Sequence, residues 1–285
     1  LFPDNTYGVE SGGNPENIPE LSYEEFLDFH RTYYHPSNSY IYLYGNMDME
    51  EKLRFIDEKY LSAFEALDVD SSIKEQAAFS QVKDLQIEYP IAENEEEDNT
   101  YLSYNMVVGN AMDSTLGVAF DVLDYALLSA PGAPLKQALL DAGIGKDIYG
   151  DYSDGVLQPY FSVITKGARA ARKEEFVSII RNCLQDIVKN GIDKKAVLSG
   201  INYMEFRYRE ADFGQFPKGL MYGLDIMGSW LYDDENAFSQ VKLLEIYDKL
   251  KIAVNEGYFE NLIQKWLLDN THGAILTLVP KRGLA

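Results

Sequence analysis

The chain of 285 residues has very few of the residue types that build covalent links and metal sites. Its only cysteine is Cys183, so the chain forms no internal disulfide and no cysteine-based zinc site. Such sparing use of cysteine fits a reducing compartment, the cytoplasm or an organelle matrix. Histidine is nearly as rare, with His30, His35 and His272 as the complete set.

Positive charge and long apolar runs are scarce too. The chain carries 25 lysines and arginines against 46 aspartates and glutamates, a formal net charge of −21. This balance argues against nucleic acid and anionic membranes as partners, because both are negatively charged. It suits cationic partners, although an acidic surface that only maintains solubility is the commoner explanation. No run reaches the ~18 apolar residues of a membrane-spanning helix, so no such helix is expected.

Motifs for nucleotide binding and nucleophilic catalysis are missing. Gly143, Gly145 and Gly150 do not form G-x-G-x-x-G, and neither a P-loop nor a G-x-S-x-G motif occurs. Cys183 lies on an apolar helical stripe with Phe176, Ile180 and Ile187, which predicts a buried, unreactive core residue. The same spacing argument assigns Met204 and Met227 to the core.

The three histidines do not have the spacing of a zinc site. His30 and His35 are five residues apart with no glutamate between them, and Pro36 breaks the helix. A zinc site needs at least three convergent ligands. We therefore expect His30 to pack or hydrogen-bond on its helix, His35 to belong to a turn, and His272 to have a turn or capping role.

The first 80 residues contain two clear helix starts. Ser22 and Glu25 form a capping box, and Asp48 caps a predicted helix over 47–65. Between them, aromatic alternation over 40–45 predicts a strand that ends at a glycine. The polar, unpatterned stretch Asp68–Ser80 is the candidate linker.

The remaining chain alternates pairs of strands with groups of helices. Strands are predicted at 83–89, 100–108, 147–151, 158–166 and 273–279, and an acidic loop at Glu93–Asn99. Helices are predicted at 113–129, from Pro134 to Gly143, and at 172–190, 193–210, 216–231, 238–254 and 257–269. This order favours an α+β layer fold over a parallel doubly wound sheet.

Several specific strings resemble one peptidase family. They are the glycine-rich loop at 11–13, LSYEEF at 21–26, YYHPSN at 33–38, YGN at 44–46, PGAPL at 131–135, DGVLQPYFSV at 154–163, YMEFRYREADFGQFPKGL at 203–220 and GSWLYD at 228–233. Together they resemble the insulinase-like zinc metallopeptidases, peptidase family M16, in the branch of the presequence proteases. The strings are spread over nearly the whole chain.

The resemblance implies a fold and a domain division. The fold is α+β, an antiparallel sheet with helices packed on one side, as in LuxS/MPP-like metallohydrolase domains. Residues 1–75 would be the end of the first, zinc-bearing domain, and residues 76–285 the second, non-catalytic domain of the same fold. The family's H-x-x-E-H motif and third zinc ligand lie upstream of the matched strings, and its assisting arginine and tyrosine lie downstream. We therefore expect no catalytic, cofactor-binding or metal-ligating residue here, and zinc only in the parent.

The chain has no initiator methionine and opens inside a family motif, so we expect it to be a fragment. By the resemblance, the parent cleaves short unstructured peptides in an enclosed chamber. The fragment, itself inactive, would supply chamber wall and peptide contacts, and its other partners would be the remaining parts of the same polypeptide. The alternative is a stand-alone inactive scaffold or peptide-binding protein of the same fold. An upstream H-x-x-E-H in the full reading frame would favour the peptidase.

One charged string has no clear assignment from sequence. Arg207, Arg209, Glu210 and Asp212 lie close to a helix break at 214–217. They would form an interdomain network, face the peptide chamber, or be solvated charges at a helix corner. The third reading is favoured because most surface charge pairs contribute little free energy.

Overall fold

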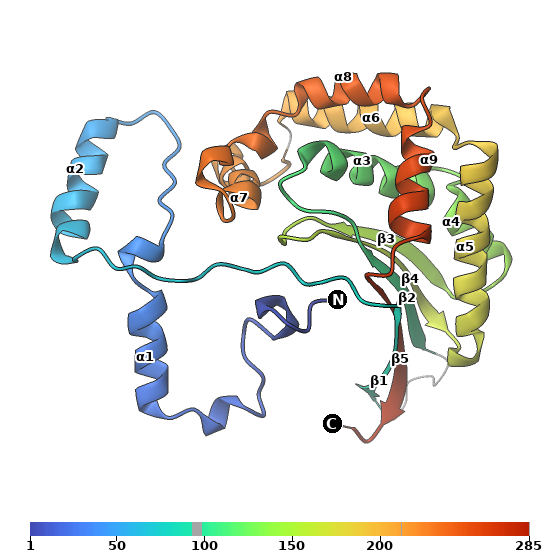
Figure 1. Cartoon of the computed structure of the whole chain (residues 1–285), viewed down its shortest axis with the longest axis horizontal. Coiled ribbons are helices and arrows are strands. Elements are labelled where there is room, and N and C mark those ends of the chain that lie inside the picture. The colour runs from blue at the N-terminus through green and yellow to red at the C-terminus, as the bar shows by residue number, and fades with distance from the viewer. Residues whose placement is uncertain (93–98, 212, 285) are drawn as a thin grey trace.

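The computed structural model describes residues 1–92, 99–211 and 213–284. The expected acidic loop Glu93–Asn99 lies almost entirely outside these residues, and so does Asp212. A five-stranded sheet in the order β1-β5-β2-β4-β3 is the centre of the described chain (Figure 1). The strands are β1 (Lys83–Ile91), β2 (Thr100–Val107), β3 (Asp147–Ser153), β4 (Tyr160–Ala168) and β5 (Gly273–Arg282). The strands predicted from residue 83 onward are confirmed, with ends that differ by a few residues.

The sheet is mixed at one edge. Most neighbouring strands pair antiparallel, but β1 and β5 pair in parallel, so the expectation of a wholly antiparallel sheet is wrong there. The last strand inserts between the first two, with Tyr101 of β2 opposite Leu278 and Lys83 of β1 opposite Ala274. Because β1 and β2 run in opposite directions, a strand lying between them must be parallel to one of the two.

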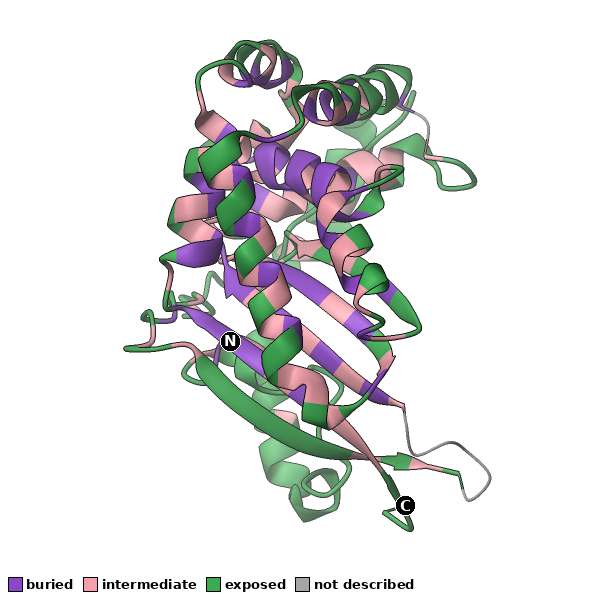
Figure 2. Ribbon diagram, turned by 90° about the vertical axis from the view of Figure 1, so that its right-hand side faces the viewer, coloured by how far each residue is buried: buried purple, intermediate pink, exposed green. Residues whose placement is uncertain are grey.

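Helices cover one face of this sheet (Figure 1). They are α3 (Ser114–Asp124), α4 (Pro134–Asp141), α5 (Lys173–Asn190), α6 (Lys194–Glu210), α8 (Leu244–Ala253) and α9 (Tyr258–Leu262). Both α3 and α9 continue as π-helical turns, Tyr125–Ser129 and Ile263–Leu268. Figure 2 shows buried residues gathered where these helices meet the sheet, whereas β1 at the edge is mostly exposed. The α+β fold with helices on one side of the sheet is confirmed.

One helical stretch, Ser114–Asp141, has the length and composition of a membrane-spanning segment. Its most apolar window is 61% buried inside the protein, which is typical of a core helix. Phe120, Leu123 and Leu127 from this stretch are fully buried in the central hydrophobic cluster. Burial against other protein elements accounts for the apolar composition of the stretch.

Cys183 lies at the edge of the core, not inside it. The residues of α5 that are buried are Phe176, Ile180, Leu184 and Ile187, and Cys183 is only half-buried against the cluster. A position seven residues after Phe176 falls about 20° short of two full turns, which moves it away from the centre of the buried face. The prediction of a buried Cys183 is therefore wrong. Met204 is half-buried against the cluster, and Met227 is half-buried outside it.

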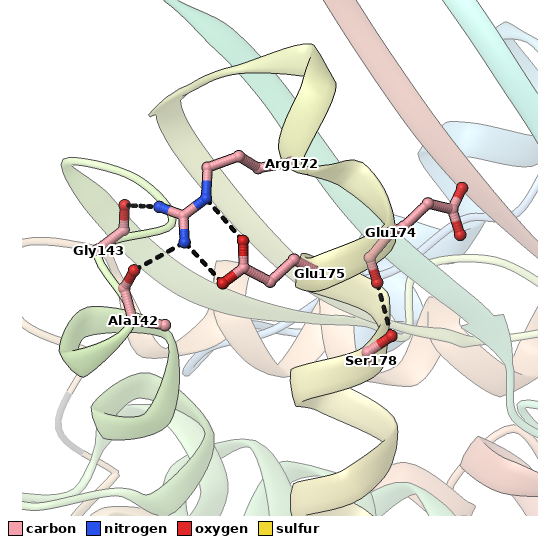
Figure 3. Close-up of polar contacts among 6 residues, drawn as sticks. All are labelled: Ala142, Gly143, Arg172, Glu174, Glu175 and Ser178. Carbon is pink, nitrogen blue, oxygen red and sulfur yellow. Dashed lines mark hydrogen bonds and ion pairs between the residues drawn. The ribbon is translucent and has the colours of Figure 1, made fainter.

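The end of α4 is closed by an arginine from the start of α5 (Figure 3). The Arg172 guanidinium donates to the carbonyl oxygens of Gly143 and Ala142, at 2.6 and 2.9 Å, and holds the Glu175 carboxylate with two bonds of 2.8 Å. Carbonyls at a helix C-terminus have no partner within the helix, so a cation there satisfies them. Gly143 ends the helix with φ +61°, as its position predicted.

Residues 9–67 form an arm that lies apart from the helical layer, and it contains α1 (Tyr23–Tyr33) and α2 (Met49–Lys59) (Figure 1). The capping box predicted at Ser22 and Glu25 is present. The helix predicted over 47–65 is shorter, because Tyr60 leaves helical geometry and only a 3₁₀ turn follows. No residue of the arm is buried, although its helices carry large apolar side chains such as Phe26 and Phe29.

Residues 40–45, predicted as a strand, are extended but pair with no strand in the part of the chain that the structure describes. They contact α7 (Lys218–Trp230) instead. A Cβ atom added to Gly223 would lie 2.8 Å from the Tyr42 ring, and one added to Gly219 would lie 2.3 Å from the Tyr44 ring. Glycines one helical turn apart therefore leave the space that two tyrosine rings occupy. The predicted alternation is retained, but without a neighbouring strand it forms no ladder.

Helical spacing predicts an apolar face on α7 made by Leu220, Leu224, Met227 and Leu231, and this prediction is wrong for the three leucines. Leu220, Leu224 and Leu231 are 51–56% exposed. The buried residues of the helix are instead Gly223, Ile226 and Ser229, on the face that the tyrosine-bearing segment and neighbouring turns approach. The spacing of apolar residues correctly predicted a helix here, but it predicted the wrong face of that helix to be buried.

Two segments tie the beginning of the chain to the sheet. Phe2 is buried, and the Leu1 carbonyl oxygen lies 2.9 Å from Nε2 of His272. The Asp4 backbone N–H donates to Gln76, whose own backbone N–H donates to Gln158 at 2.6 Å. The candidate linker Asp68–Ser80 contains no helix or strand, yet Gln76 within it is buried. Residues 1–7 and 74–80 are therefore packed against the sheet-containing part.

Candidate functional site

The histidines are placed as structural residues. His30 stacks on Tyr34 with ring centroids 4.7 Å apart, and Nδ1 of His35 accepts the Ser37 backbone N–H at 3.1 Å. His272 is buried, and burial lowers its pKa. Among the described residues, no group of three His, Cys, Asp or Glu side chains is arranged to hold a metal ion. The predicted helix and turn roles of His30 and His35 are confirmed, and His272 fixes the N-terminal segment.

The charged string splits into separate contacts. Arg209 pairs with Glu205 of its own helix at 2.6 Å, and Lys251 from α8 pairs with the other Glu205 oxygen. The hydrogen bond from Lys251, followed by that from Arg209, lowers the pKa of Glu205. Arg207 lies over the Tyr203 ring at 5.7 Å. This network joins α6 to α8 within the helical layer, and Glu205 at its centre had no signal in the sequence beyond its position on a half-apolar helix.

A more distinctive site is an acidic cavity of about 370 Å³ where α3 and α7 meet the β3–β4 turn. Four aspartates and two tyrosines contribute to its wall: Asp113, Asp121, Asp154, Asp225, Tyr152 and Tyr208. They come from α3 and its N-cap, the turn after β3, α7, β3 and α6. The cavity therefore exists only when these separate elements pack together.

The carboxylates in this cavity disfavour each other's ionisation. Burial, followed by Asp154 and Asp124, raises the pKa of Asp121 to about 7. Burial and then Asp154 raise the pKa of Asp225. Burial, followed by Asp121, Asp154 and Asp113, raises the pKa of Tyr152. Carboxylates withdrawn from water and close to one another hold protons more tightly than isolated ones. A pKa near 7 in a concave site is typical of functional positions.

No lysine, arginine or histidine lines this cavity in the described part of the protein. The Asp121 carboxylate is enclosed by protein on most sides, accepts no hydrogen bond there, and keeps some exposure toward the cavity. Asp113, in contrast, is engaged as the N-cap of α3, where it accepts the Leu116 N–H at 3.0 Å. Asp121 therefore has no partner for its charge within the described chain, and the same holds for Asp225.

Sequence reasoning did not identify this cavity. The available signal was a pair of aspartates, Asp121 and Asp124, inside an otherwise apolar helix whose neighbours Phe120 and Val122 are fully buried. Charged residues are almost never buried unless they are paired, so such positions are conspicuous. The contribution of Asp225 had no sequence signal, because it depends on how α7 packs.

A second, apolar groove of about 780 Å³ separates the arm from the helical layer. Its wall includes residues 41–44, Leu53 and Ile56 of the arm, and Ile226 and Trp230 of α7. It contains few polar groups, so it offers no chemistry of its own. It marks where the apolar surface of the arm is left uncovered.

Comparison with known proteins shows to which family the chain belongs. Residues 20–203 match the family model described as peptidase M16 inactive domain. The chain is 46% identical to "Protein HypA" of Clostridium perfringens over 285 residues, which covers 100% of the chain and 29% of that protein. It is 36% identical to presequence protease 1, chloroplastic/mitochondrial, of Arabidopsis thaliana, covering 98% of the chain and 27% of that protein.

A solved structure agrees with this fold. The peptidase M16 inactive domain from Pseudomonas fluorescens superposes with a TM-score of 0.71 at 16% identity, over 99% of this chain and 63% of that one. The chain spans less than a third of the length of the two relatives named above. Its sequence and fold together show that it belongs to peptidase family M16, as an inactive-domain member related to the presequence proteases.

Proposed function

We propose that this chain is the non-catalytic wall of a zinc-dependent metalloendopeptidase that degrades short unstructured peptides. Residues 1–75 would be the end of the zinc-bearing domain, and residues 76–285 the complete second domain. The relationship to presequence proteases supports this role. Zinc would be bound by the catalytic part of the longer protein, and peptides would contact the wall without being cleaved by it.

The observation that carries the proposal is the uneven burial of the chain. Between residues 1 and 75 only Phe2 is buried, whereas the sheet and its helices enclose a continuous core. Helices such as α1 and α2 obtain most of their stability from packing of an apolar face. An arm with two amphipathic helices and no buried face therefore lacks the elements that would cover it, as expected for part of a larger sheet-and-helix domain.

The test compares the chain with the product of the complete reading frame. The purified chain should bind no stoichiometric zinc and should not cleave a fluorogenic peptide. It should still bind a labelled unstructured peptide, measured by fluorescence anisotropy. The complete product should bind one zinc ion and lose peptidase activity with a chelator.

Three results would overturn the proposal. Failure of the chain to bind any unstructured peptide would remove its peptide-contacting role. Chelator-sensitive cleavage by the chain alone would show that it is catalytic. A complete product that binds peptide but has neither zinc nor activity would favour the inactive scaffold instead.

A further inference from the structure

We propose that the acidic cavity between α3, α7 and the β3–β4 turn binds the guanidinium side chain of an arginine in an unstructured peptide. This inference rests on the proposed peptide-contacting function and adds a specific subsite to it. The cavity is separate from the apolar groove along the arm, and the two share only Tyr208 of the residues that line them.

The negative charge of the cavity favours a cationic ligand. Asp121, Asp154 and Asp225 line it together, and no basic side chain of the described residues lines it with them. The pKa of each of the three carboxylates is raised by burial and by a neighbouring carboxylate. A bound cation would reverse that effect, because opposite charge nearby favours the ionised form. Ligand binding would therefore relieve a repulsion that the empty protein contains.

Asp121 gives an independent indication of a ligand. Buried polar groups in folded proteins nearly always have a hydrogen-bond partner. The Asp121 carboxylate has none in the described chain, and its remaining exposure is toward the cavity. Its immediate helix neighbours, Phe120 and Val122, are fully buried, so the side chain cannot turn into the core without meeting apolar groups. A donor entering from the cavity would satisfy it.

The remaining wall favours guanidinium over a metal ion. The side chains that line the cavity include Tyr152 and Tyr208, and aromatic faces attract guanidinium groups. Tyr152 is held in place by stacking on Phe120, with ring centroids 5.7 Å apart. No three acidic groups of the described residues converge at metal-ligand geometry. The volume of 370 Å³ lies in the range of about 300–1,000 Å³ found for small-ligand sites.

Two glycines and a glutamine also line the cavity. A Cβ atom added to Gly117 would lie 3.7 Å from the Tyr152 hydroxyl, and one added to Gly228 would lie 3.7 Å from the Gln240 side chain. Gln240 is itself fixed by a bond of 2.8 Å from its amide to the Ala111 carbonyl. Both Cβ positions would be in ordinary van der Waals contact, so the room beside the aspartates is the cavity itself and does not depend on these two glycines. A flat, planar donor with an extended stem suits such a space better than a compact, strongly hydrated ammonium.

The experiment uses the full chain and three labelled peptides that differ at one residue. A flexible glycine-serine peptide carries arginine, lysine or citrulline, the last being a neutral isostere of arginine. Fluorescence anisotropy at constant pH and salt measures each dissociation constant. We expect the arginine peptide to bind about tenfold more tightly than the citrulline peptide, as one or two charge-assisted bonds would give. The double variant Asp121→Asn with Asp225→Asn should abolish that difference and leave citrulline binding unchanged.

Asp186→Asn is the matched control, because Asp186 is an exposed aspartate of α5 outside the cavity. It should keep the preference for arginine. Equal binding of arginine and citrulline peptides to the unmodified chain, or a preference that survives in the double variant, would overturn the subsite while leaving the peptide-binding wall intact. Failure of every peptide to bind would overturn both proposals. Competition by stoichiometric calcium, magnesium or zinc would identify a metal site instead.

Discussion

Neutralising Asp121 should stabilise the protein at alkaline pH. Burial and neighbouring carboxylates raise the pKa of Asp121 from 3.8 to about 7. Between about pH 4 and pH 7 the folded protein keeps a proton that the unfolded chain has released, so the free energy of unfolding falls as the pH rises through this window. An asparagine at this position cannot ionise, so the variant does not show this fall in the free energy of unfolding.

The magnitude follows from the same values. A pKa raised from 3.8 to about 7 corresponds to an upper limit of about 4 kcal/mol, at about 1.36 kcal/mol per pH unit. The cavity admits water, which screens part of the electrostatic penalty, so the observed difference should be smaller than this limit. We expect Asp121→Asn to be about 1–3 kcal/mol more stable than the unmodified chain at pH 8, with a difference that shrinks steadily as the pH falls and vanishes below about pH 4.

Urea unfolding at pH 5, 6, 7 and 8, followed by circular dichroism, measures this difference as a shift of the midpoint at constant slope. Asp186→Asn removes the same charge from an exposed position and should follow the pH dependence of the unmodified chain. An Asp121→Asn variant with an unchanged pH dependence, or with lower stability at pH 8, would show that Asp121 is not held protonated by its surroundings. Stability gained in this way would be consistent with a binding site that strains the empty protein.

Three further outcomes are expected. Tyr104→Phe should lower the free energy of unfolding by about 1–2 kcal/mol, because the buried Tyr104 hydroxyl donates to the Leu267 carbonyl at the end of a helix, whereas Tyr149→Phe at an exposed position should change it little. Cys183 should react slowly with a thiol reagent at pH 7.5, because burial and then Asp186 raise its pKa to about 11; labelling as fast as that of a free thiol would contradict this. Limited proteolysis should cut first within residues 9–20 or 66–73 and leave a resistant piece that begins near residue 74, and an initial cut inside α5 or α6 would disprove the proposed domain division.

Much of the fold was accessible from local pattern. The Ser22–Glu25 capping box, the stop at Gly143 and the start of α6 at Asp193 were each predicted, because caps and glycine stops act within a few residues of the chain. The strands from residue 83 onward were predicted by alternation. Their pairing was not, since the insertion of β5 between β1 and β2 joins residues almost 200 positions apart.

The errors share one physical origin. Helical spacing shows that a face is apolar, but not which neighbouring element covers it. On α7 the rings of Tyr42 and Tyr44 pack against glycines, and the leucine face remains exposed. On α5 the buried face includes Leu184, and Cys183 lies at the edge of that face. Over 40–45 the alternation was real, but a strand needs a partner, and the described chain provides none.

The sequence by itself determined the family, the order of the elements and the rarity of metal-binding residues, because these depend on composition and on strings that can be read one after another. The acidic cavity, in contrast, is formed only by the tertiary structure. Asp121, Asp154 and Asp225 come from a buried helix, a turn and a helix more than 70 residues further on, and only Asp121, inside an apolar helix, gives any signal in the sequence. Burial, and then the proximity of other carboxylates, raises their pKa values. Loss of hydration and electrostatic repulsion depend on distance in space and not on separation along the chain.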